Sequence, residues 1–78
     1  MSEILKRKTS VGAKFRASRM AMGLSQKTVA ARLQMKGFNI NEKTISRLER
    51  GMSNPQIIIL LELAEIYNTP IQDFFEIE

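Results

Sequence analysis

The chain contains no cysteine, no histidine and no tryptophan among its 78 residues. Without cysteine it can form neither disulfides nor thiolate metal sites. Without histidine it lacks the most common general base and the most common metal ligand. Its carboxylates are scattered, so the sequence offers no nucleophile–base pair and no metal cluster, and an enzyme is not favoured. We therefore expect no catalytic residue, no metal site and no cofactor.

Long apolar segments are also missing. No apolar run approaches the length of a membrane span, and we expect no signal peptide ahead of the domain. We therefore expect no membrane partner and a cytoplasmic location. A chain of 78 residues predicts one domain with a modest core, and 44% hydrophobic with 26% charged residues is typical of a globular protein.

Positive charge is absent from the C-terminal part of the chain. All 12 lysines and arginines lie in residues 1–50, beside only three acids, whereas residues 51–78 hold five acids and no base. Such asymmetry favours a polyanionic partner for the first part only, because acids close to phosphates would repel them. A solvated basic surface without a partner explains the charges alone equally well.

Turn and cap residues divide the chain into five predicted helices. Residues 1–8, which include Lys6-Arg7-Lys8, show no periodicity, and we expect a flexible basic arm there ahead of a domain over residues 9–78. The predicted helices run from Thr9 or Ser10 to Met22, from Gln26 to Lys36, from Asn41 to just before Gly51, from Asn54-Pro55 to Tyr67, and from Thr69-Pro70-Ile71-Gln72 through Phe75. The predicted stops are Gly23, Gly37, Gly51 and Asn68. No segment alternates with period two over a useful length, so the fold class is all-α.

The apolar residues of these helices recur at helical spacing and define a predicted core. Its members are Val11, Phe15, Met22, Val29, Ala30, Leu33, Ile45, Leu48, Ile57, Leu60, Leu61, Ala64, Tyr67, Ile71, Phe74 and Phe75, with Ile40 filling and Phe38 covering the joint before the third helix. A second stripe on the fourth helix, Ile59, Leu63 and Ile66 with Ile58 beside it, predicts a homodimer interface formed with the fifth helix. A fully buried central helix is the alternative.

The segment from Glu42 to Gly51 carries the strongest functional pattern. Ile45 and Leu48 lie three residues apart on one side of the predicted helix. The other sides carry Lys43, Ser46, Arg47 and Arg50. A short helix with a basic and polar face suits a DNA major groove, because Arg and Lys reach guanine O6 and N7, and surplus positive charge meets phosphate.

Four pieces of the chain together resemble a known family. The pieces are Gly23-Leu24-Ser25-Gln26, Val29-Ala30-Ala31-Arg32-Leu33, Thr44-Ile45-Ser46-Arg47-Leu48-Glu49-Arg50-Gly51 and Asn54-Pro55. In this order, with glycine stops between them, they resemble the Cro/phage-repressor (Xre-type) helix-turn-helix family over about residues 10–75. The resemblance implies a compact five-helix, lambda-repressor-like domain. It also implies a sequence-specific DNA-binding transcriptional regulator, a repressor being favoured, which binds a pseudo-palindromic operator as a dimer with its third helix in the major groove.

The resemblance assigns roles to matching positions. It implies base contacts by Asn41, Glu42, Lys43, Ser46 and Arg47, phosphate contacts by Gln26, Thr44 and Arg50, and a partly buried structural salt bridge between Arg19 and Glu49. Gln26 would also hold the start of the recognition helix. Glu42 either accepts from a cytosine amino group or only favours the helix N-terminus.

One departure and one alternative function stay open. The connection over residues 35–41 is longer than is usual in the family, which affects the register of the third helix. The alternative is an antitoxin-like interaction module that binds a partner protein through its apolar surface and represses its own operon as a complex. The sequence does not separate a repressor from an activator.

Overall fold

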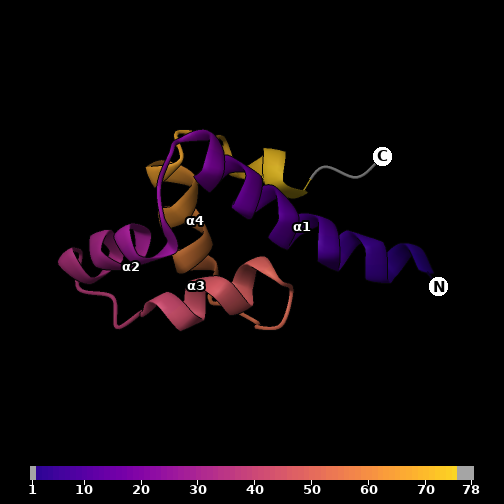
Figure 1. The fold of residues 1–78 in the computed structure, drawn as a ribbon. Coiled ribbons are helices and arrows are strands. Elements are labelled where there is room, and N and C mark those ends of the chain that lie inside the picture. The colour runs from indigo at the N-terminus through magenta and orange to yellow at the C-terminus, as the bar shows by residue number, and fades with distance from the viewer. Residues whose placement is uncertain (1, 76–78) are drawn as a thin grey trace.

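Four α-helices and one short 3₁₀ helix make up residues 2–75, the part of the chain that this computed structural model describes (Figure 1). They are α1 (Ser2–Ala21), α2 (Gln26–Met35), α3 (Glu42–Glu49), α4 (Ile57–Ile66) and the 3₁₀ helix η1 (Ile71–Phe75). The described residues include no strand, so the all-α fold class is right. The prediction of five α-helices is one too many.

The last predicted helix is a 3₁₀ turn, and its expected cap does not form. The hydroxyl of Thr69 donates to the carbonyl of Tyr67 at 3.0 Å instead of accepting from the following turn. The N–H of Asp73 donates to the carbonyl of Pro70 at 3.0 Å, which is the three-residue spacing of a 3₁₀ helix. The predicted capping box at residues 69–72 is therefore wrong.

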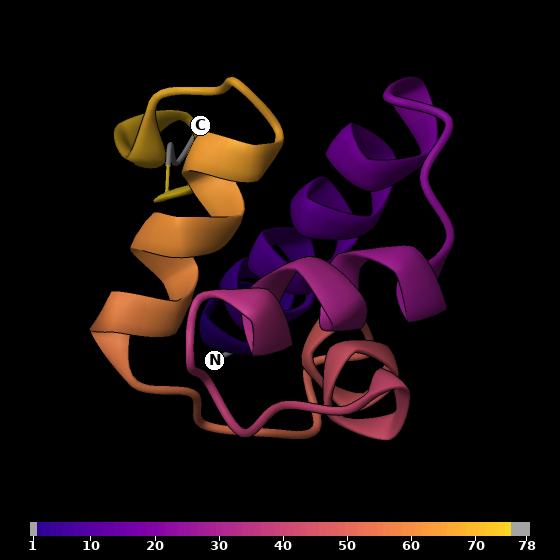
Figure 2. The same ribbon diagram turned by 90° about the vertical axis from the view of Figure 1, so that its left-hand side faces the viewer.

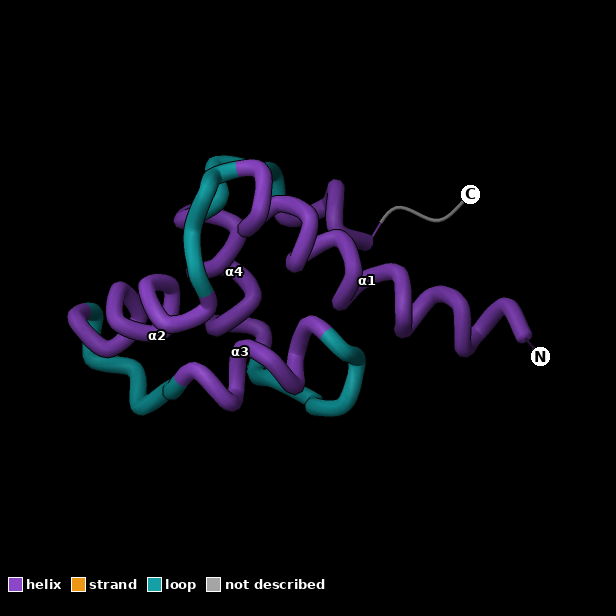
Figure 3. Tube along the Cα trace, in the orientation of Figure 1, coloured by secondary structure: helices purple, strands orange, loops and turns teal. Residues whose placement is uncertain are grey.

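Helix α1 is longer than the sequence suggested. It starts at Ser2, so the predicted start at Thr9 or Ser10 is wrong, and residues 2–8 are helical. These residues contain neither glycine nor proline, and Leu5, Lys6 and Arg7 favour helix. The N-terminal part of α1 extends well beyond the other helices (Figures 1 and 3). The division between a flexible arm and a domain at residue 8 stays a prediction.

The caps around α2 and α3 lie where the sequence placed them. The hydroxyl of Ser25 accepts from the backbone N–H of Thr28 at 3.0 Å, and Asn41 is the N-cap of α3. Gly23, Gly37 and Gly51 all have positive φ, as the predicted helix stops require. Asn68 also adopts a left-handed conformation, with φ of 53°, just beyond α4.

Helix α4 begins later than predicted. Gln56 is its N-cap and makes no side-chain cap hydrogen bond, so Asn54 is not the cap and Pro55 is not the first helical residue. The buried residues of the helix are Ile59, Leu63 and Ala64. None of the described helices is both long and apolar enough to cross a membrane.

The core forms where α1, α2, α3, α4 and η1 meet. Its buried apolar side chains are Phe15, Val29, Ala30, Leu33, Ile45, Leu48, Ile59, Leu63, Ala64, Tyr67 and Phe74. The rings of Phe15 and Phe74 stack with centroids 4.0 Å apart, which joins α1 to η1. Phe38 and Ile40 pack against the core, as expected. Met22, Ile57, Leu61 and Phe75 are exposed, so their assignment to the core is wrong.

Gly12 sets how closely α1 approaches α3. A Cβ atom at this position would lie 2.6 Å from the carbonyl oxygen of Glu49 and 2.8 Å from that of Leu48. Both neighbours are backbone atoms, which cannot move aside as a side chain can. Only glycine therefore permits this approach, which brings the end of α3 against α1.

Candidate nucleic-acid interface

One face of α3 is free of the core and carries the predicted base-contacting residues. Ile45, Leu48 and Glu49 are buried, and they anchor the helix. Asn41, Glu42, Lys43 and Arg47 are exposed, and Ser46 is half-buried. Residues 43 and 47, and residues 42, 46 and 50, are spaced at i, i+4, so they lie along the same side of the helix. Glu42, Lys43, Ser46 and Arg47 thus share one side of α3, and Asn41 lies exposed at its N-terminal end.

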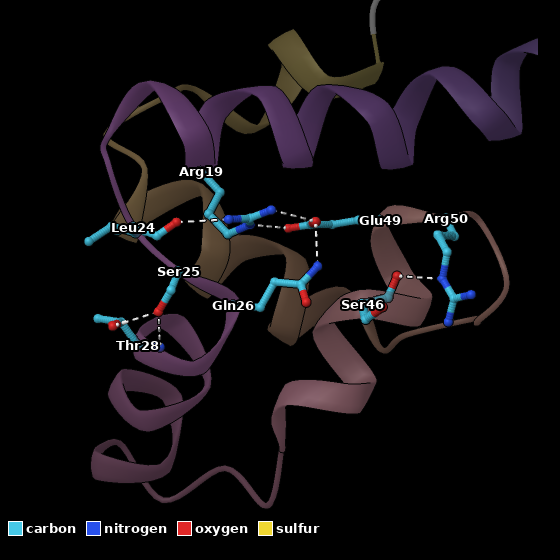
Figure 4. Close-up of polar contacts among 8 residues, drawn as sticks. All are labelled: Arg19, Leu24, Ser25, Gln26, Thr28, Ser46, Glu49 and Arg50. Atoms are coloured by element: carbon cyan, nitrogen blue, oxygen red, sulfur yellow. Dashed lines mark hydrogen bonds and ion pairs between the residues drawn. The ribbon is translucent and has the colours of Figure 1, made fainter.

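A buried ion pair holds the other end of α3 (Figure 4). The Nε atom of Arg19 donates to Oε2 of Glu49 at 2.7 Å, and its Nη2 atom donates to Oε1 at 3.1 Å. The Nη1 atom of Arg19 donates to the carbonyl of Leu24 at 2.8 Å. The hydrogen bonds to Glu49 raise the pKa of the Arg19 guanidinium, against the opposing effect of burial. The pair links α1, the turn before α2 and the end of α3.

Gln26, the first residue of α2, joins the same carboxylate. Its Nε2 atom donates to Oε1 of Glu49 at 3.0 Å (Figure 4). Gln26 was expected to hold the start of the recognition helix, but this bond reaches its last residue instead. The reason is that Glu49 presents a buried, acceptor-only carboxylate beside the N-terminus of α2. The sequence did not reveal this bond, because no spacing rule connects residues 26 and 49.

The other predicted phosphate contacts lie at the two ends of α3. Thr44 is half-buried, and its backbone N–H and hydroxyl both donate to Oδ1 of Asn41, at 3.0 and 3.1 Å. Arg50 is exposed, and its Nε atom donates weakly to the carbonyl of Ser46 at 3.4 Å, close to the C-terminus of the helix (Figure 4). Most of the Arg50 guanidinium remains at the surface.

A surface cross-link between α2 and α4 was not predicted. The Nζ atom of Lys36 lies 2.8 Å from Oε1 of Glu62 and 3.2 Å from Oε1 of Glu65. Hydrogen bonds, first to Glu62 and then to Glu65, raise the pKa of Lys36. An exposed pair of this kind adds little stability. It does, however, pair one lysine with two acidic residues of α4.

The predicted dimer stripe on α4 lies mostly inside the protomer. Ile59 and Leu63 are core residues with exposed fractions of 6% and 1%, and Ile66 is half-buried. Only Ile58 of the four predicted residues is exposed, at 42%. The exposed apolar residues of α4 are instead Ile57, Ile58 and Leu61, here called the α4 patch. Figure 2 shows α4 at the left edge of the molecule.

The model of the helix-turn-helix family matches residues 15–74, which is most of the chain. The chain belongs to the Xre/Cro-type helix-turn-helix family. A solved structure, described as the crystal structure of the DNA-binding domain of BldD, is similar with a TM-score of 0.75 and 30% sequence identity. The alignment covers 97% of this chain and 100% of that one. A comparison with curated proteins found no match.

Membership of this family confirms the resemblance drawn from the sequence, and it identifies which helices form the helix-turn-helix motif. In this helix-turn-helix family of DNA-binding transcription regulators, α2 and α3 form the motif, and α3 is the second, recognition helix. Residues 2–14 of α1 lie outside the segment that the family model matches.

Proposed function

We propose that the chain is a sequence-specific transcriptional repressor that acts in the cytoplasm. In this proposal α3 lies in the major groove of a pseudo-palindromic operator. The bound protein then represses transcription by occluding a promoter. The observation that supports it best is the exposed face of α3, where Lys43 and Arg47 stand opposite the buried Ile45 and Leu48. Residues 51–78 contain no lysine or arginine, so the positively charged side chains all lie in residues 1–50, the part that includes α1, α2 and α3.

The proposed DNA contacts fall into two kinds, those to bases and those to phosphates. Arg47 is exposed and carries the rigid guanidinium fork that pairs with guanine O6 and N7, so we assign it the main base contact. Lys43, Ser46 and Glu42 share its surface, and Asn41 at the start of the helix completes the base-contacting set. Arg50 and Gln26 flank that set and are assigned to phosphates on either side of the groove. The backbone N–H groups at the start of α2 support the assignment of Gln26, because they attract anions.

We further propose that two copies associate through the α4 patch and η1. Ile57 is 61% exposed, Ile58 42%, Leu61 43% and Phe75 41%, which leaves several large apolar side chains in water. Contiguous apolar surface on a small domain commonly marks a partner site. A two-fold dimer through this surface would present two α3 helices to half-sites about 34–36 Å apart, one helical turn of DNA.

An antitoxin-like module is the second candidate, and the same apolar surface favours it. In that case a different protein covers the α4 patch, and the complex represses its own operon. Sedimentation of the purified chain at high concentration, alone and with DNA, separates the two. A dimer supports the homodimeric repressor, whereas a strict monomer in both states excludes it and leaves the patch to another protein.

Selection of bound duplexes from a random DNA pool at near-physiological salt tests the function itself. Enrichment of a palindrome would support a dimeric, base-contacting regulator. Enrichment of a single half-site would support base contacts without the dimer. Uniform binding that falls steeply with salt, without enrichment, would contradict sequence-specific binding by this chain.

A further inference from the structure

Asn41 is committed to holding the start of α3. It precedes the helix with an extended backbone, and its Oδ1 atom accepts from the backbone N–H of Thr44 at 3.0 Å. The same Oδ1 atom accepts from the Thr44 hydroxyl at 3.1 Å. A backbone N–H can only donate, so the amide atom that faces it must be the oxygen. The orientation of the Asn41 carboxamide is therefore fixed by chemistry.

These two bonds leave Asn41 able to donate and unable to accept. A carboxamide oxygen has two lone pairs, and both are engaged by Thr44. The two N–H groups of Nδ2 remain, and no hydrogen bond from them to another described residue is formed. Because Asn41 is exposed at the N-terminal end of α3, these two donors face the surface that would meet the groove.

The free donors determine which bases Asn41 can distinguish. The usual pairing of asparagine with adenine needs both functions, since the oxygen accepts from N6 while the nitrogen donates to N7. An asparagine that caps its helix with both lone pairs cannot make that pairing. Its N–H groups suit the acceptors of guanine, N7 and O6, and the O4 atom of thymine, and they oppose the N4 amino group of cytosine.

We propose that Asn41 is a donor-only specificity residue that selects guanine or thymine over cytosine at one position of each half-site. This inference rests on the proposed function, in which α3 enters the major groove. Thr44 then acts as a positioning residue. Its hydroxyl donates to Asn41 at 3.1 Å, and while that bond is kept the same proton does not serve a phosphate oxygen, which can only accept. This assignment replaces the phosphate contact expected for Thr44.

The substitution Asn41→Ser separates the cap from the base contact. Serine caps a helix about as well as asparagine but carries no N–H donor and is too short to reach a base. The random-pool selection is run with the wild type, with Asn41→Ser and with Asn39→Ser, an exposed asparagine of the same connection. We expect similar melting temperatures for all three. Asn41→Ser should lose the guanine or thymine preference at one position and bind the best duplex about 2- to 12-fold more weakly, as for one hydrogen bond.

Thr44 is tested by a pair of variants read out on base preference. Thr44→Val removes the hydroxyl while keeping the shape, and it frees one lone pair of Asn41. We expect the preference at the Asn41 position to relax in Thr44→Val and to be restored in Thr44→Ser. A role of Thr44 in stability alone would leave the base preference unchanged in both variants, and that result would overturn the positioning role.

The outcomes separate this inference from the proposed function. An enriched motif that is identical for the wild type and Asn41→Ser overturns the inference and leaves the function standing. A wild type without enrichment overturns both. A third outcome is an adenine preference that depends on Asn41. If this preference weakens when a purine without the N6 amino group replaces the adenine, then Oδ1 accepts from the base. That result also overturns the inference.

Discussion

Replacing Glu49 by alanine should remove much of the stability of the domain. The Glu49 side chain is only 2% exposed and accepts three hydrogen bonds, two from Arg19 and one from Gln26. Its removal leaves the Arg19 guanidinium, which is 11% exposed, without its charged partner. The position is also where α3 packs against Gly12 of α1, so solvent has little access to compensate.

The expected magnitude follows from the burial of the pair. Removing one partner of a buried ion pair costs about 3–5 kcal/mol, because the other charge stays buried and unpaired. A domain of 78 residues has a total free energy of unfolding of about 4–12 kcal/mol at the usual value per residue. Each kcal/mol shifts the melting temperature of such a domain by about 4–8 °C. We expect Glu49→Ala to melt about 12–40 °C below the wild type.

Urea and thermal unfolding followed by circular dichroism measure this loss. The control is Glu65→Ala, which removes an exposed carboxylate from the Lys36 cross-link and should change stability little. The double variant Arg19→Met with Glu49→Leu should recover part of the loss, because it buries no unpaired charge. A loss of less than about 1 kcal/mol for Glu49→Ala would refute the argument that this pair holds α3.

Three further predictions concern packing and protonation. Gly12→Ala should cost about 1–3 kcal/mol in denaturant unfolding, because its Cβ would meet the backbone of α3, and a variant as stable as the wild type would contradict that approach. Burial raises the pKa of Tyr67, and its hydroxyl has no partner among the described residues. Its neutral form is therefore favoured by folding, and stability should be complete below about pH 10 and fall as the pH rises above it. Tyr67→Phe should abolish that alkaline loss, and an unchanged pH profile would assign it to another group. Leu63→Ala should cost about 2–5 kcal/mol of unfolding free energy, whereas Leu61→Glu should leave monomer stability nearly unchanged and shift sedimentation toward the monomer. Equal destabilisation by the two leucine substitutions would contradict the orientation of α4.

The parts of the fold that the sequence predicted depend on local chemistry. Ser25 and Asn41 cap their helices because a short polar side chain before a helix can accept from its first turn. Gly51 ends α3 because a left-handed residue is needed there. The meeting of Arg19 and Glu49 was expected only from the family resemblance, since no local rule connects residues 30 positions apart.

The parts that escaped prediction depend on three-dimensional context. Helix α4 is apolar on nearly all sides, so periodicity did not determine which side faces the core. The sequence therefore predicted Ile57 in the core, whereas the structure buries Ile59 and exposes Ile57. The bond between Gln26 and Glu49 and the cross-link of Lys36 join residues far apart in sequence. The use of both lone pairs of Asn41 by Thr44 became visible only with atomic positions.

The sequence preference of Arg47→Ala tests most directly whether α3 contacts bases. The control is Arg32→Ala. Arg32 is an exposed residue of α2 that lies near Glu65 and Ile66 of α4. Affinities of the wild type and both variants are measured on the selected duplex and on all its single-base-pair variants. We predict that Arg47→Ala costs about 1–3 kcal/mol and relaxes the preference at one base pair, while Arg32→Ala keeps the full preference. An equal loss on every duplex would make Arg47 a phosphate contact, and no loss at all would contradict the placement of α3 in the major groove.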